Sequence, residues 1–525
     1  MTMQPVLING QWQPAQNARG SFRAFAPTSG EAIGPDFPIS GADDLQAALT
    51  AAVAVADKLA AVAPEQIAAF FEAYAAGIEA DAATLVELAH TETALPAETR
   101  LAKVELPRTC GQLRQAARAV REYSWTQPVI DQTTGLRSHR APLYKPVLLF
   151  GPNNFPYAFN AIAGSDFASA IAARNPVIAK AHPNHPATSE RLAQIAHEAL
   201  RKAGLPLATV QMVYHFEHAL GAELAGDRRL GAIGFTGSRA GGLALKAAAD
   251  AAGVPAYLEL SSVNPVFVLP GALAERGETL AQEFFASCTM GSGQFCTNPG
   301  VLVLPAGDDA DAFVEAATRH FAAAAPGVLF ASGVQQHLEQ SVATLQAASA
   351  RCLAGGKSAG PGFRFQPTLL SVDAETFLAN PQALQTEAFG PVSLLVRATD
   401  SASMLAVAKA FEGNLTGTLY SATDGSDDDS SRTLGAALRP RVGRLISNRM
   451  PTGVAVSPAM NHGGPYPSTS HPGFTAVGLP AAILRFTALH CYDNVPDAQL
   501  PTELRDQNSA GIARQVDGVW RNDSL

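Results

Sequence analysis

The sequence has no long hydrophobic run and no segment typical of secretory export. No apolar stretch among its 525 residues approaches the roughly 20 residues that a membrane-spanning helix requires. Residues 1–5 lack the basic segment and the apolar core of a signal peptide. We therefore expect no membrane partner and a location in the cytoplasm.

Positive charge is also scarce and dispersed. The chain has 37 Lys and Arg residues against 46 Asp and Glu residues, which gives a formal net charge of −9, and its basic residues form no runs. Nucleic-acid-binding surfaces usually appear as clustered Lys and Arg. We therefore expect no nucleic-acid partner.

Cysteines are few, and their spacing is not that of a disulfide framework. The five cysteines, at positions 110, 288, 296, 352 and 491, are an odd number without tight pairing. This favours free thiols in a reducing compartment. A lone cysteine is usually buried and inert, and we expect this of Cys110, Cys288, Cys352 and Cys491.

The overall composition is that of an ordinary globular protein. Hydrophobic residues make up 47% of the chain and charged residues 16%, which excludes a mainly disordered protein. A chain of this length is too long for one ordinary core, so we expect two or three domains. No internal repeat of the solenoid type is present.

The hydrophobic pattern predicts an α/β fold. Residues 43–125 read as helical, and from residue 145 short β-rich runs alternate with helices. This alternation is typical of a parallel sheet covered by helices, with ligands at the strand ends. The expected strands are 147–150, 176–179, 210–214, 230–235 and 256–260, and the expected helices are 159–173, 188–203 and 239–252.

A second α/β region extends from about residue 262 to residue 470. Loops rich in Pro and Gly dominate residues 449–480, and an apolar run at 482–489 predicts a final strand. The strands expected in this second region are 263–269, 300–304, 392–396 and 444–447.

Two segments resemble metal sites only superficially. Residues 424–431 lack the glycine and the distal glutamate of a calcium loop, so we expect a solvated loop that caps the next helix. His182 and His185 are followed by prolines that prevent helical presentation, and no acidic or cysteine partner is close in the sequence. We therefore predict no metal site.

Cys296 differs from the other cysteines in its surroundings. It lies in the segment GSGQFCTNPG (residues 291–300), among glycines and just before an expected strand. A thiol presented in this way is accessible, and helix N-termini or backbone N–H groups can lower its pKa. We predict that Cys296 is a nucleophile.

The segment GQFCT around Cys296 resembles the nucleophile motif of the aldehyde dehydrogenase superfamily. Five other segments resemble motifs of that family, in the family's order, although the fourth has Ser-Ser where Gly-Gly is usual. They are residues 151–156 (GPNNFP), 178–183 (IAKAHP), 234–242 (GFTGSRAGG), 258–265 (LELSSVNP) and 386–391 (TEAFGP). The set covers most of the chain, and by it the chain is identified as a member of this superfamily.

The resemblance implies oxidation of an aldehyde to a carboxylic acid with NAD(P)⁺. Cys296 would attack the carbonyl and pass through a thiohemiacetal to a thioester. The Asn154 amide and the Cys296 backbone N–H would bind the oxyanion. Glu259, at the end of an apolar strand where partial burial increases its basicity, would be the general base that activates water.

The resemblance also implies a cofactor site. The turn containing Gly237, Ser238 and Gly242 leads into a helix, whose N-terminus favours a pyrophosphate. Alone, this turn is a common loop and is not the Gly-x-Gly-x-x-Gly fingerprint. Lys180 would reach the adenosine ribose.

In the same family Glu387 would bind the nicotinamide ribose, and Phe389 would pack beside the nicotinamide. Relatives that prefer NAD often carry a glutamate three residues after the lysine, where this chain has Pro183, preceded by His182. Loss of a carboxylate and gain of a basic group favour NADP, with NAD as the alternative.

Residues 451–469 resemble a subgroup that contains α-ketoglutaric semialdehyde (2,5-dioxopentanoate) dehydrogenases and an NADP-linked fatty aldehyde dehydrogenase. The first substrate carries a carboxylate, which requires a cationic or strongly donating partner. We predict that Arg449 is the carboxylate clamp, the side chain that binds this carboxylate. An arginine that only forms a salt bridge within its loop is at least as good an interpretation of Arg449. Phe159, Ser292 and Phe295 are the expected pocket walls, which would equally suit an apolar aldehyde.

Three alternatives to oxidation of 2,5-dioxopentanoate stay open. The first is a long-chain or broad-specificity NADP-dependent aldehyde dehydrogenase, and the second is a catalytically silent structural or binding protein. The third is a cysteine hydrolase, which requires a histidine beside the thiol; no such histidine is identifiable from the sequence near Cys296.

The resemblance implies a Rossmann-type cofactor domain, an α/β catalytic domain and a β oligomerisation arm. A strand near 482–490 would pair with the hairpin at 126–144 in a partner subunit, which implies a homodimer or homotetramer. The expected parts are 1–125 with 145–258 (cofactor), 126–144 with 479–495 (arm), 259–478 (catalytic) and 496–525 (tail).

Overall fold

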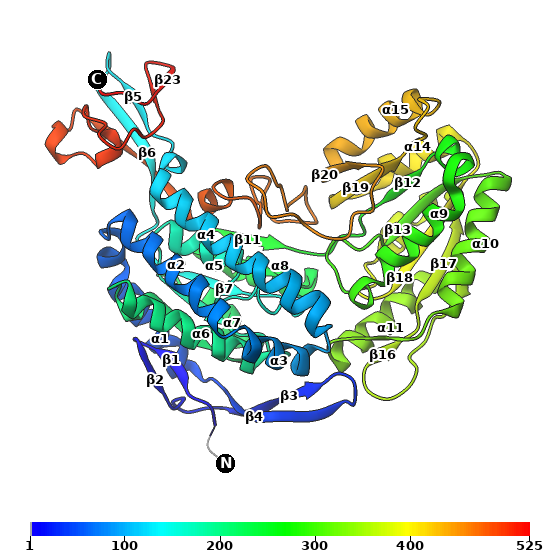
Figure 1. Cartoon of the computed structure of the whole chain (residues 1–525), viewed down its shortest axis with the longest axis horizontal. Helices are drawn as coiled ribbons and strands as arrows, with labels where there is room; N and C mark the ends of the chain where they lie inside the picture. The colour runs from blue at the N-terminus through cyan, green and yellow to red at the C-terminus, as the bar shows by residue number, and fades with distance from the viewer. Residues whose placement is uncertain (1–2) are drawn as a thin grey trace.

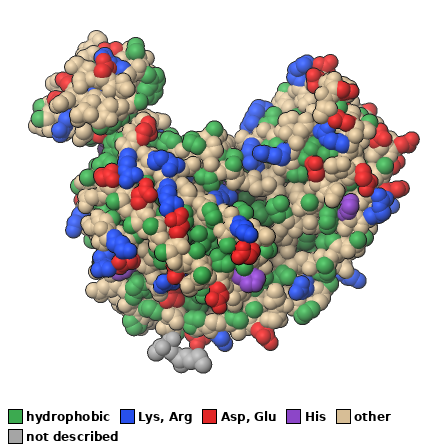
Figure 2. All heavy atoms as spheres, viewed as in Figure 1, with side chains coloured by type: hydrophobic (Ala, Val, Ile, Leu, Met, Phe, Trp, Pro, Cys, Tyr) green, Lys and Arg blue, Asp and Glu red, His purple; other side chains and the backbone are tan. Residues whose placement is uncertain are grey.

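The computed structural model describes residues 3–525 as two α/β lobes with a small β arm projecting from the first (Figure 1). The chain segment between β20 and the arm runs across the space between the two lobes. Figure 2 shows that the surface is hollowed there. No helix among the described residues is both long and apolar enough to cross a membrane.

The first lobe is built on a seven-stranded sheet in the order β11-β10-β7-β8-β9-β1-β2. Strands β7 to β11 are mutually parallel wherever they pair, as the alternating pattern predicts. Their bounds are β7 (Val147–Phe150), β8 (Val177–Lys180), β9 (Val210–Val213), β10 (Ala232–Thr236) and β11 (Ala256–Glu259). The antiparallel strands β1 (Val6–Ile8) and β2 (Gln11–Gln13) and the hairpin β3 (Gly20–Ala26)–β4 (Glu31–Ile39) precede them.

Helices cover this sheet, and their apolar faces form the largest hydrophobic core of the molecule. The region expected to be helical over 43–125 contains α1 (Ala42–Ala60), α2 (Pro64–Ala80), α3 (Ala82–Thr93), a π-helical segment η1 (Ala97–Glu105) and α4 (Leu106–Glu122). The later helices are α5 (Ser165–Ala172), α6 (Pro186–Lys202), α7 (His218–Ala225) and α8 (Arg239–Ala252).

The helix expected over 159–173 begins only at Ser165. Residues before it form turns, in which the N–H of Gly164 donates to the carbonyl oxygen of Asn160 at 2.7 Å. A Cβ on Gly164 would lie 2.5 Å from the Cα of Phe159. This tight packing of backbone on backbone replaces the first helical turns and leaves the segment as a wall of the site.

The second lobe contains another seven-stranded sheet, in the order β15-β17-β18-β13-β12-β19-β20. All its strand pairs are parallel except that of β15 with β17. The strands are β12 (Val266–Val268), β13 (Val301–Pro305), β15 (Arg351–Ala354), β17 (Thr368–Asp373), β18 (Val392–Ala398), β19 (Asn414–Tyr420) and β20 (Val442–Ser447). A small pair, β14 (Gly327–Val328) and β16 (Arg364–Phe365), lies beside it.

Apolar clusters lie on both faces of this second sheet, under its helices. The helices are α9 (Pro270–Thr289), α10 (Asp308–Ala323), α11 (Ser332–Ala347), α12 (Ala374–Ala379), α13 (Pro381–Leu384), α14 (Ser401–Ala410) and α15 (Asp428–Leu438). Asp427 is buried and accepts hydrogen bonds from the N–H groups of Gly271 and Ala272. The expectation of a solvated loop that caps the next helix is therefore wrong for Asp427, which caps α9 because β19 ends beside it.

The arm is a five-stranded sheet in the order β21-β6-β5-β22-β23. It contains β5 (Val129–Asp131), β6 (Leu136–Pro142), β21 (Thr487–Asp493), β22 (Arg514–Val516) and β23 (Val519–Arg521). The C-terminal tail, for which the sequence suggested no structure, thus adds two strands to the arm. Figure 1 shows this sheet standing away from both lobes.

Two expectations about the arm are wrong. Strand β21 pairs with β6 of its own chain, with Thr487 opposite Pro142, rather than with a partner's hairpin. Residues 481–486 form a 3₁₀ helix instead of a strand. The carbonyl oxygen of Phe486 accepts from Asn175 Nδ2 at 2.8 Å, which anchors this turn to the first lobe and places Thr487 beside β6.

Apart from Cys296, the cysteines form a buried pair on helices and an exposed pair on edge strands. Cys110 and Cys288 are buried as expected, whereas Cys352 and Cys491 are exposed. The expectation of burial is wrong for these two because each lies on an edge strand, β15 and β21, with one side open to solvent.

Candidate active site

The site begins where the order of the first sheet reverses. β7 is followed in the chain by β8 on one side and, later, by β10 on the other. At such a switch point the loops diverge and leave a crevice at the carboxyl ends of the strands. The loop after β7 carries Asn154, the turn after β10 carries Gly237, and β11 ends at Glu259. The N–H of Gly237 donates to the Glu259 carbonyl oxygen at 3.1 Å.

Cys296 reaches this crevice from the second lobe, on the loop that precedes β13. Asn264 holds the loop, because its Nδ2 donates to the carbonyl oxygens of Cys296 at 2.8 Å and Asn298 at 2.9 Å. Asn264 adopts a left-handed conformation (φ +49) that asparagine tolerates. Asn414 Oδ1 accepts from the Asn264 N–H at 3.0 Å, so the segment that leads to the nucleophile is fixed on both sides.

Asn154 is buried and joins the two lobes at the nucleophile. Its Nδ2 donates to the carbonyl oxygen of Gln294, two residues before Cys296, at 3.0 Å. Gln294 Oε1 in turn accepts from the N–H of Phe330 at 2.9 Å. One N–H of the Asn154 amide is thereby used to orient the group, and an amide nitrogen carries a second N–H.

Gly293 allows the nucleophile loop to approach the loop before β18. It has a positive φ of 69, and an added Cβ would lie 2.1 Å from the carbonyl oxygen of Gly390 and 2.5 Å from the nitrogen of Pro391. Backbone atoms cannot move aside as a flexible side chain can. The loop therefore requires glycine at this position.

We expect Gly293→Ala to lower the free energy of unfolding by about 2 kcal/mol or more, because of both the clash and the backbone strain. Displacement of the loop should also reduce activity. Gly111→Ala is the control, because Gly111 lies inside α4 with open space around an added Cβ. It should change stability by less than about 1 kcal/mol. Denaturant titration measures both, and equal stabilities would contradict the close approach.

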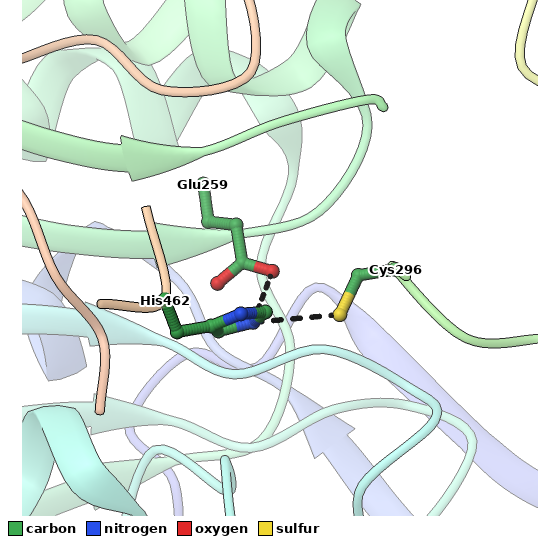
Figure 3. A group of neighbouring side chains, drawn as sticks. All are labelled: Glu259, Cys296 and His462. Carbon is green, nitrogen blue, oxygen red and sulfur yellow. Dashed lines mark hydrogen bonds and ion pairs between the residues drawn. The ribbon is translucent and has the colours of Figure 1, made fainter. Parts of the chain in front are cut away.

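Three functional side chains meet in the crevice (Figure 3). His462 Nε2 lies 3.0 Å from Glu259 Oε1 and 3.5 Å from Cys296 Sγ. Glu259 is 1% exposed and His462 2% exposed, so this contact is shielded from water. A single ring nitrogen is close to both partners. It is within hydrogen-bond distance of the thiol, whereas its contact with Glu259 has an ion-pair distance but neither carboxylate oxygen accepts a hydrogen bond within residues 3–525.

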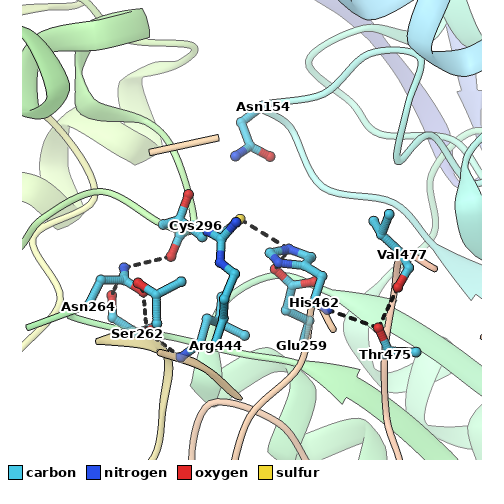
Figure 4. Close-up of polar contacts among 12 residues, drawn as sticks. Asn154, Glu259, Ser262, Asn264, Cys296, Arg444, His462, Thr475 and Val477 are labelled. Atoms are coloured by element: carbon cyan, nitrogen blue, oxygen red, sulfur yellow. Dashed lines mark hydrogen bonds and ion pairs between the residues drawn. The ribbon is translucent and has the colours of Figure 1, made fainter. Parts of the chain in front are cut away.

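His462 is positioned by a long loop that runs back along β11. The N–H of Leu260 donates to Ser468 O at 2.8 Å, and the N–H of Ser470 donates to Leu258 O at 3.1 Å. The His462 N–H donates to Thr475 Oγ1 at 2.9 Å (Figure 4). These bonds place the imidazole beside the last residue of the strand.

Sequence reasoning missed His462, because no histidine beside the thiol was identifiable from the sequence. His462 lies 166 residues from Cys296, and no local spacing links the two. The available signal was its position among glycines within residues 451–469, the segment whose pattern is least like the common family pattern.

Burial raises the pKa of the Cys296 thiol well above its usual value, and the nearby carboxylates of Glu259 and Glu387 raise it further. The sequence suggested that helix N-termini or backbone N–H groups can lower this pKa, whereas burial and the two carboxylates act in the opposite direction. A raised pKa favours the protonated thiol, so a candidate nucleophile in this setting needs a base to remove its proton.

Aromatic rings form the wall beside this cluster. Phe155 lies between Phe159 and Phe295, at ring-centroid distances of 5.0 Å and 5.6 Å. The Phe159 ring is 5.7 Å from the His462 ring. Two of the three expected pocket residues, Phe159 and Phe295, thus belong to one buried apolar cluster at the site.

The other two substrate residues from the sequence lie elsewhere. Ser292, with a positive φ of 56, is half-buried and close to Gly327 of β14. Arg449 is exposed on the loop after β20, and no hydrogen bond or ion pair joins it to the cluster within residues 3–525. The structure therefore gives no support for Arg449 as the carboxylate clamp.

The expected adenosine-side residues follow β8. Lys180 is its last residue, and burial lowers the pKa of this lysine to about 8. Burial, reinforced by His185 and Lys180, lowers the pKa of His182 well below its usual value. His182 Nδ1 accepts from the Asn184 N–H at 3.1 Å. The lowered pKa disfavours a charged imidazole at His182, and with Nδ1 accepting, its proton lies on Nε2. Pro183 is half-buried beside it.

The expected pyrophosphate turn forms the N-terminus of α8. Ser238 Oγ caps the helix by accepting from the Gly241 N–H at 3.3 Å. A Cβ on Gly237 would lie 2.8 Å from the Phe235 ring, and one on Gly242 would lie 2.4 Å from Leu260 Cδ2. The glycines therefore let the helix start close to the sheet, with its N–H groups at the crevice.

Glu387 and Phe389 are half-buried on the loop before β18, which Gly293 packs against. Ser341 Oγ donates to the Glu387 carbonyl oxygen at 3.0 Å. Burial raises the pKa of the Glu387 carboxyl to about 7. This loop belongs to the second lobe, as does the loop that carries Cys296.

Comparison with known proteins identifies the family. Residues 12–487 match the model of the aldehyde dehydrogenase family. The chain belongs to the aldehyde dehydrogenase family. It is 40% identical to "Alpha-ketoglutaric semialdehyde dehydrogenase 2" of Azospirillum brasilense, over 95% of this chain and 96% of that protein. It is 37% identical to the enzyme named "Alpha-ketoglutaric semialdehyde dehydrogenase" in Acinetobacter baylyi, over 98% of each chain.

Solved structures of this family share the fold. Lactaldehyde dehydrogenase from Escherichia coli superposes with a TM-score of 0.80 at 23% identity, covering 94% of this chain and 99% of that one. Aldehyde dehydrogenase C from Pseudomonas syringae, solved with NAD⁺ and octanal, gives a TM-score of 0.79 at 19% identity, covering 95% and 98%. The chain is thus an oxidoreductase of a family that acts on aldehydes with NAD(P)⁺.

Proposed function

We propose that this aldehyde dehydrogenase oxidises 2,5-dioxopentanoate to 2-oxoglutarate, with NADP⁺ preferred over NAD⁺. The observation that supports catalysis is the buried contact of His462 with both Cys296 and Glu259. The substrate is supported by the names of the two relatives at 40% and 37% identity. A thiol, a base and an amide at one crevice also argue against a silent binding protein.

The first step removes the thiol proton. With the ring proton on Nδ1, His462 Nε2 accepts the proton of Cys296 Sγ across 3.5 Å as sulfur bonds to the aldehyde carbon. The imidazolium then faces Glu259 Oε1 at 3.0 Å and keeps the proton while the thioester forms. The raised thiol pKa makes this base necessary, because little thiolate exists beforehand.

The carbonyl oxygen gains negative charge as the carbon–sulfur bond forms. The second N–H of Asn154 and the Cys296 backbone N–H would donate to it, since the bond to Gln294 keeps the amide oriented. A nicotinamide cofactor, when bound, supplies the hydride acceptor. What remains on Cys296 is a thioester.

Hydrolysis of the thioester requires an activated water. Glu259, buried beside His462, would take a proton from that water as its oxygen attacks the acyl carbon. Cleavage of the carbon–sulfur bond returns the electron pair to sulfur, which regains its proton from the imidazolium. One carboxylate–imidazole pair thus serves both halves of the reaction.

The residues at the crevice fit a nicotinamide cofactor. The α8 N-terminus begins close to the end of β10, because Gly237 and Gly242 pack against Phe235 and Leu260 without a Cβ. Lys180 is half-buried at the end of β8, and it makes no ion pair within residues 3–525. We propose NADP⁺ because Lys180 and the neutral Nε2 donor of His182 suit a 2′-phosphate, and Pro183 supplies no carboxylate to repel it.

We also propose three functional parts. Residues 1–125 and 145–258 would bind the cofactor, residues 259–478 would carry the nucleophile, and the arm would assemble a homodimer or homotetramer. The arm supports assembly because it stands away from both lobes and exposes Leu489 (67%), Val519 (64%) and Trp520 (63%) on its strands. These side chains lie on the two edge strands of the arm, β21 and β23, and exposed apolar residues on unpaired strand edges are typical of interaction surfaces.

Substrate profiling tests the proposal. We expect kcat/KM for 2,5-dioxopentanoate to exceed that for pentanal by at least about 10-fold, because pentanal has the same length but no carboxylate. Reduction of NADP⁺ and NAD⁺ is followed by absorbance with each aldehyde. A preference for pentanal would favour an enzyme for apolar aldehydes, and a preference for NAD⁺ would overturn the cofactor proposal.

A further inference from the structure

Arg108 is half-buried, and its guanidinium group has no acidic partner within residues 3–525. It lies in the first turn of α4, and its Nη2 is buried with no hydrogen-bond acceptor. Its recorded hydrogen bond is a long one, from Nε to Gln112 Oε1 at 3.5 Å. No carboxylate lies within ion-pair distance of it among residues 3–525, whereas Arg100, one element earlier, pairs with Glu105. A buried donor of this kind is rarely left unused.

The guanidinium lies on the aromatic wall of the site. Its central carbon is 5.1 Å from the Phe159 ring centroid and 5.5 Å from the Phe155 ring centroid. The Phe159 ring is next to His462, and the Phe155 ring is next to Phe295, which precedes Cys296. Cation–π contacts with two rings hold the group in place without consuming its N–H donors.

The positive charge of Arg108 interacts electrostatically with Cys296 and Glu259. Burial lowers the pKa of Arg108 to about 10, while Glu105, Cys296 and Glu259 each act to raise it. Arg108 conversely lowers the pKa of the Cys296 thiol. The group remains a cation at neutral pH, close enough to the nucleophile for the two charges to interact.

We infer that Arg108 binds the carboxylate of the substrate whose aldehyde carbon is attacked by Cys296; this inference rests on the proposed function. A guanidinium offers parallel N–H donors that match the two oxygens of a carboxylate. An acid with its aldehyde at the other end spans the apolar wall between the two residues. Uncharged aldehydes would leave Nη2 without an acceptor, which selects against them.

Arg444 also lies near Cys296, and it is already engaged. It extends from β20 toward Cys296 in Figure 4. Its Nη2 donates to the carbonyl oxygens of Pro451 at 3.0 Å and Gly453 at 3.1 Å. Arg444 therefore holds the loop that leads to His462, and the free donors belong to Arg108.

The test is Arg108→Met, assayed with 2,5-dioxopentanoate and with pentanal. The readout is the ratio of the two kcat/KM values, because any general loss of activity cancels in the ratio. We expect the ratio to fall by at least about 30-fold, since truncation leaves a desolvated carboxylate unpaired. The loss should appear mainly in KM for the acid, because the carboxylate is bound equally before and during the reaction.

Arg118→Met is the matched control, because Arg118 is exposed on the same helix. Its ratio should equal that of the wild type. Arg108→Lys keeps the positive charge but loses the parallel N–H donors of the guanidinium, and should lower the ratio by roughly 10-fold. If Arg108→Met does not fold, the ratio measured for Arg108→Lys serves as the test. A ratio that Arg108 substitutions leave unchanged would overturn the inference.

The two proposals fail differently. If the wild-type enzyme does not prefer 2,5-dioxopentanoate to pentanal, the proposed substrate is wrong. If the wild type has that preference and the folded Arg108 variants keep it, the substrate stands and the role of Arg108 is wrong. Inhibition of pentanal oxidation by 2-oxoglutarate gives an independent readout, and it should weaken in Arg108→Met.

Discussion

Cys296→Ser is expected to lower the rate of aldehyde oxidation by at least about four orders of magnitude. A hydroxyl loses its proton far less readily than a thiol, and His462 at 3.5 Å is a weak base for that task. The alkoxide is also a poorer leaving group than a thiolate when the acyl group is released. Steady-state NADPH formation measures the loss.

The matched control is Cys352→Ser, because Cys352 is a free thiol exposed on an edge strand. It should retain wild-type activity, and both variants should bind NADPH, followed by its fluorescence, with wild-type affinity. Activity that survives in Cys296→Ser but not in Cys352→Ser would exclude Cys296 as the nucleophile.

The raised pKa of Cys296 also predicts how the thiol reacts without substrate. A thiol with a pKa above its usual value is mostly protonated at neutral pH, and the thiolate fraction increases as the pH rises. Iodoacetamide should therefore label Cys296 slowly at neutral pH and faster at each higher pH, without a plateau below pH ~9. Rapid labelling that is independent of pH near neutrality would show a preformed thiolate.

His462→Phe has the second-largest expected effect, a roughly 10²- to 10⁴-fold decrease in the rate of acylation. The substituted ring fills a similar volume beside Phe159 but has no nitrogen to accept the thiol proton. Because proton removal precedes thioester formation, the pre-steady-state burst of NADPH should slow. Rapid-mixing absorbance measures it, and an unchanged burst rate would exclude His462 as the base.

Glu259→Gln separates the two members of the pair. This variant keeps His462 beside the thiol, so a burst should still occur, but the thioester should accumulate because no carboxylate accepts the proton of water. The matched control for His462→Phe, the preceding variant, is His337→Phe. His337 is exposed on α11, and its substitution should leave activity as in the wild type. A normal steady state in Glu259→Gln would refute the general-base role.

Much of the fold could be predicted because it follows from local patterns. Buried parallel strands are short apolar runs between turns, and the expected strand at 176–179 forms as β8 (Val177–Lys180). Where expectation failed, a tertiary contact overrode the local pattern. Residues 482–486 are apolar enough for a strand, yet the bond from Asn175 to Phe486 holds them as a turn on the first lobe.

The candidate site divides in the same way. Cys296, Glu259 and Asn154 each stand within a short motif, because each is tied to the end of one strand and its loop. His462 and Arg108 stand in no such motif. Each reaches the site from a separate element, and only the packing of that element shows that the side chain lies at the site.

The sequence by itself determined the family, the α/β class, and the candidate nucleophile, base and oxyanion donor. These could be predicted because each candidate residue lies in a short contiguous motif next to a strand, which can be recognised in the linear sequence. Only the tertiary structure shows that burial and nearby carboxylates raise the pKa of Cys296 and that His462 lies beside its thiol. It also moved the candidate carboxylate clamp from Arg449, which is exposed, to Arg108, whose Nη2 is buried and has no hydrogen-bond partner within residues 3–525. Burial, electrostatic coupling and unmet hydrogen bonds depend on residues far apart in the chain, and these properties exist only once the two lobes pack together.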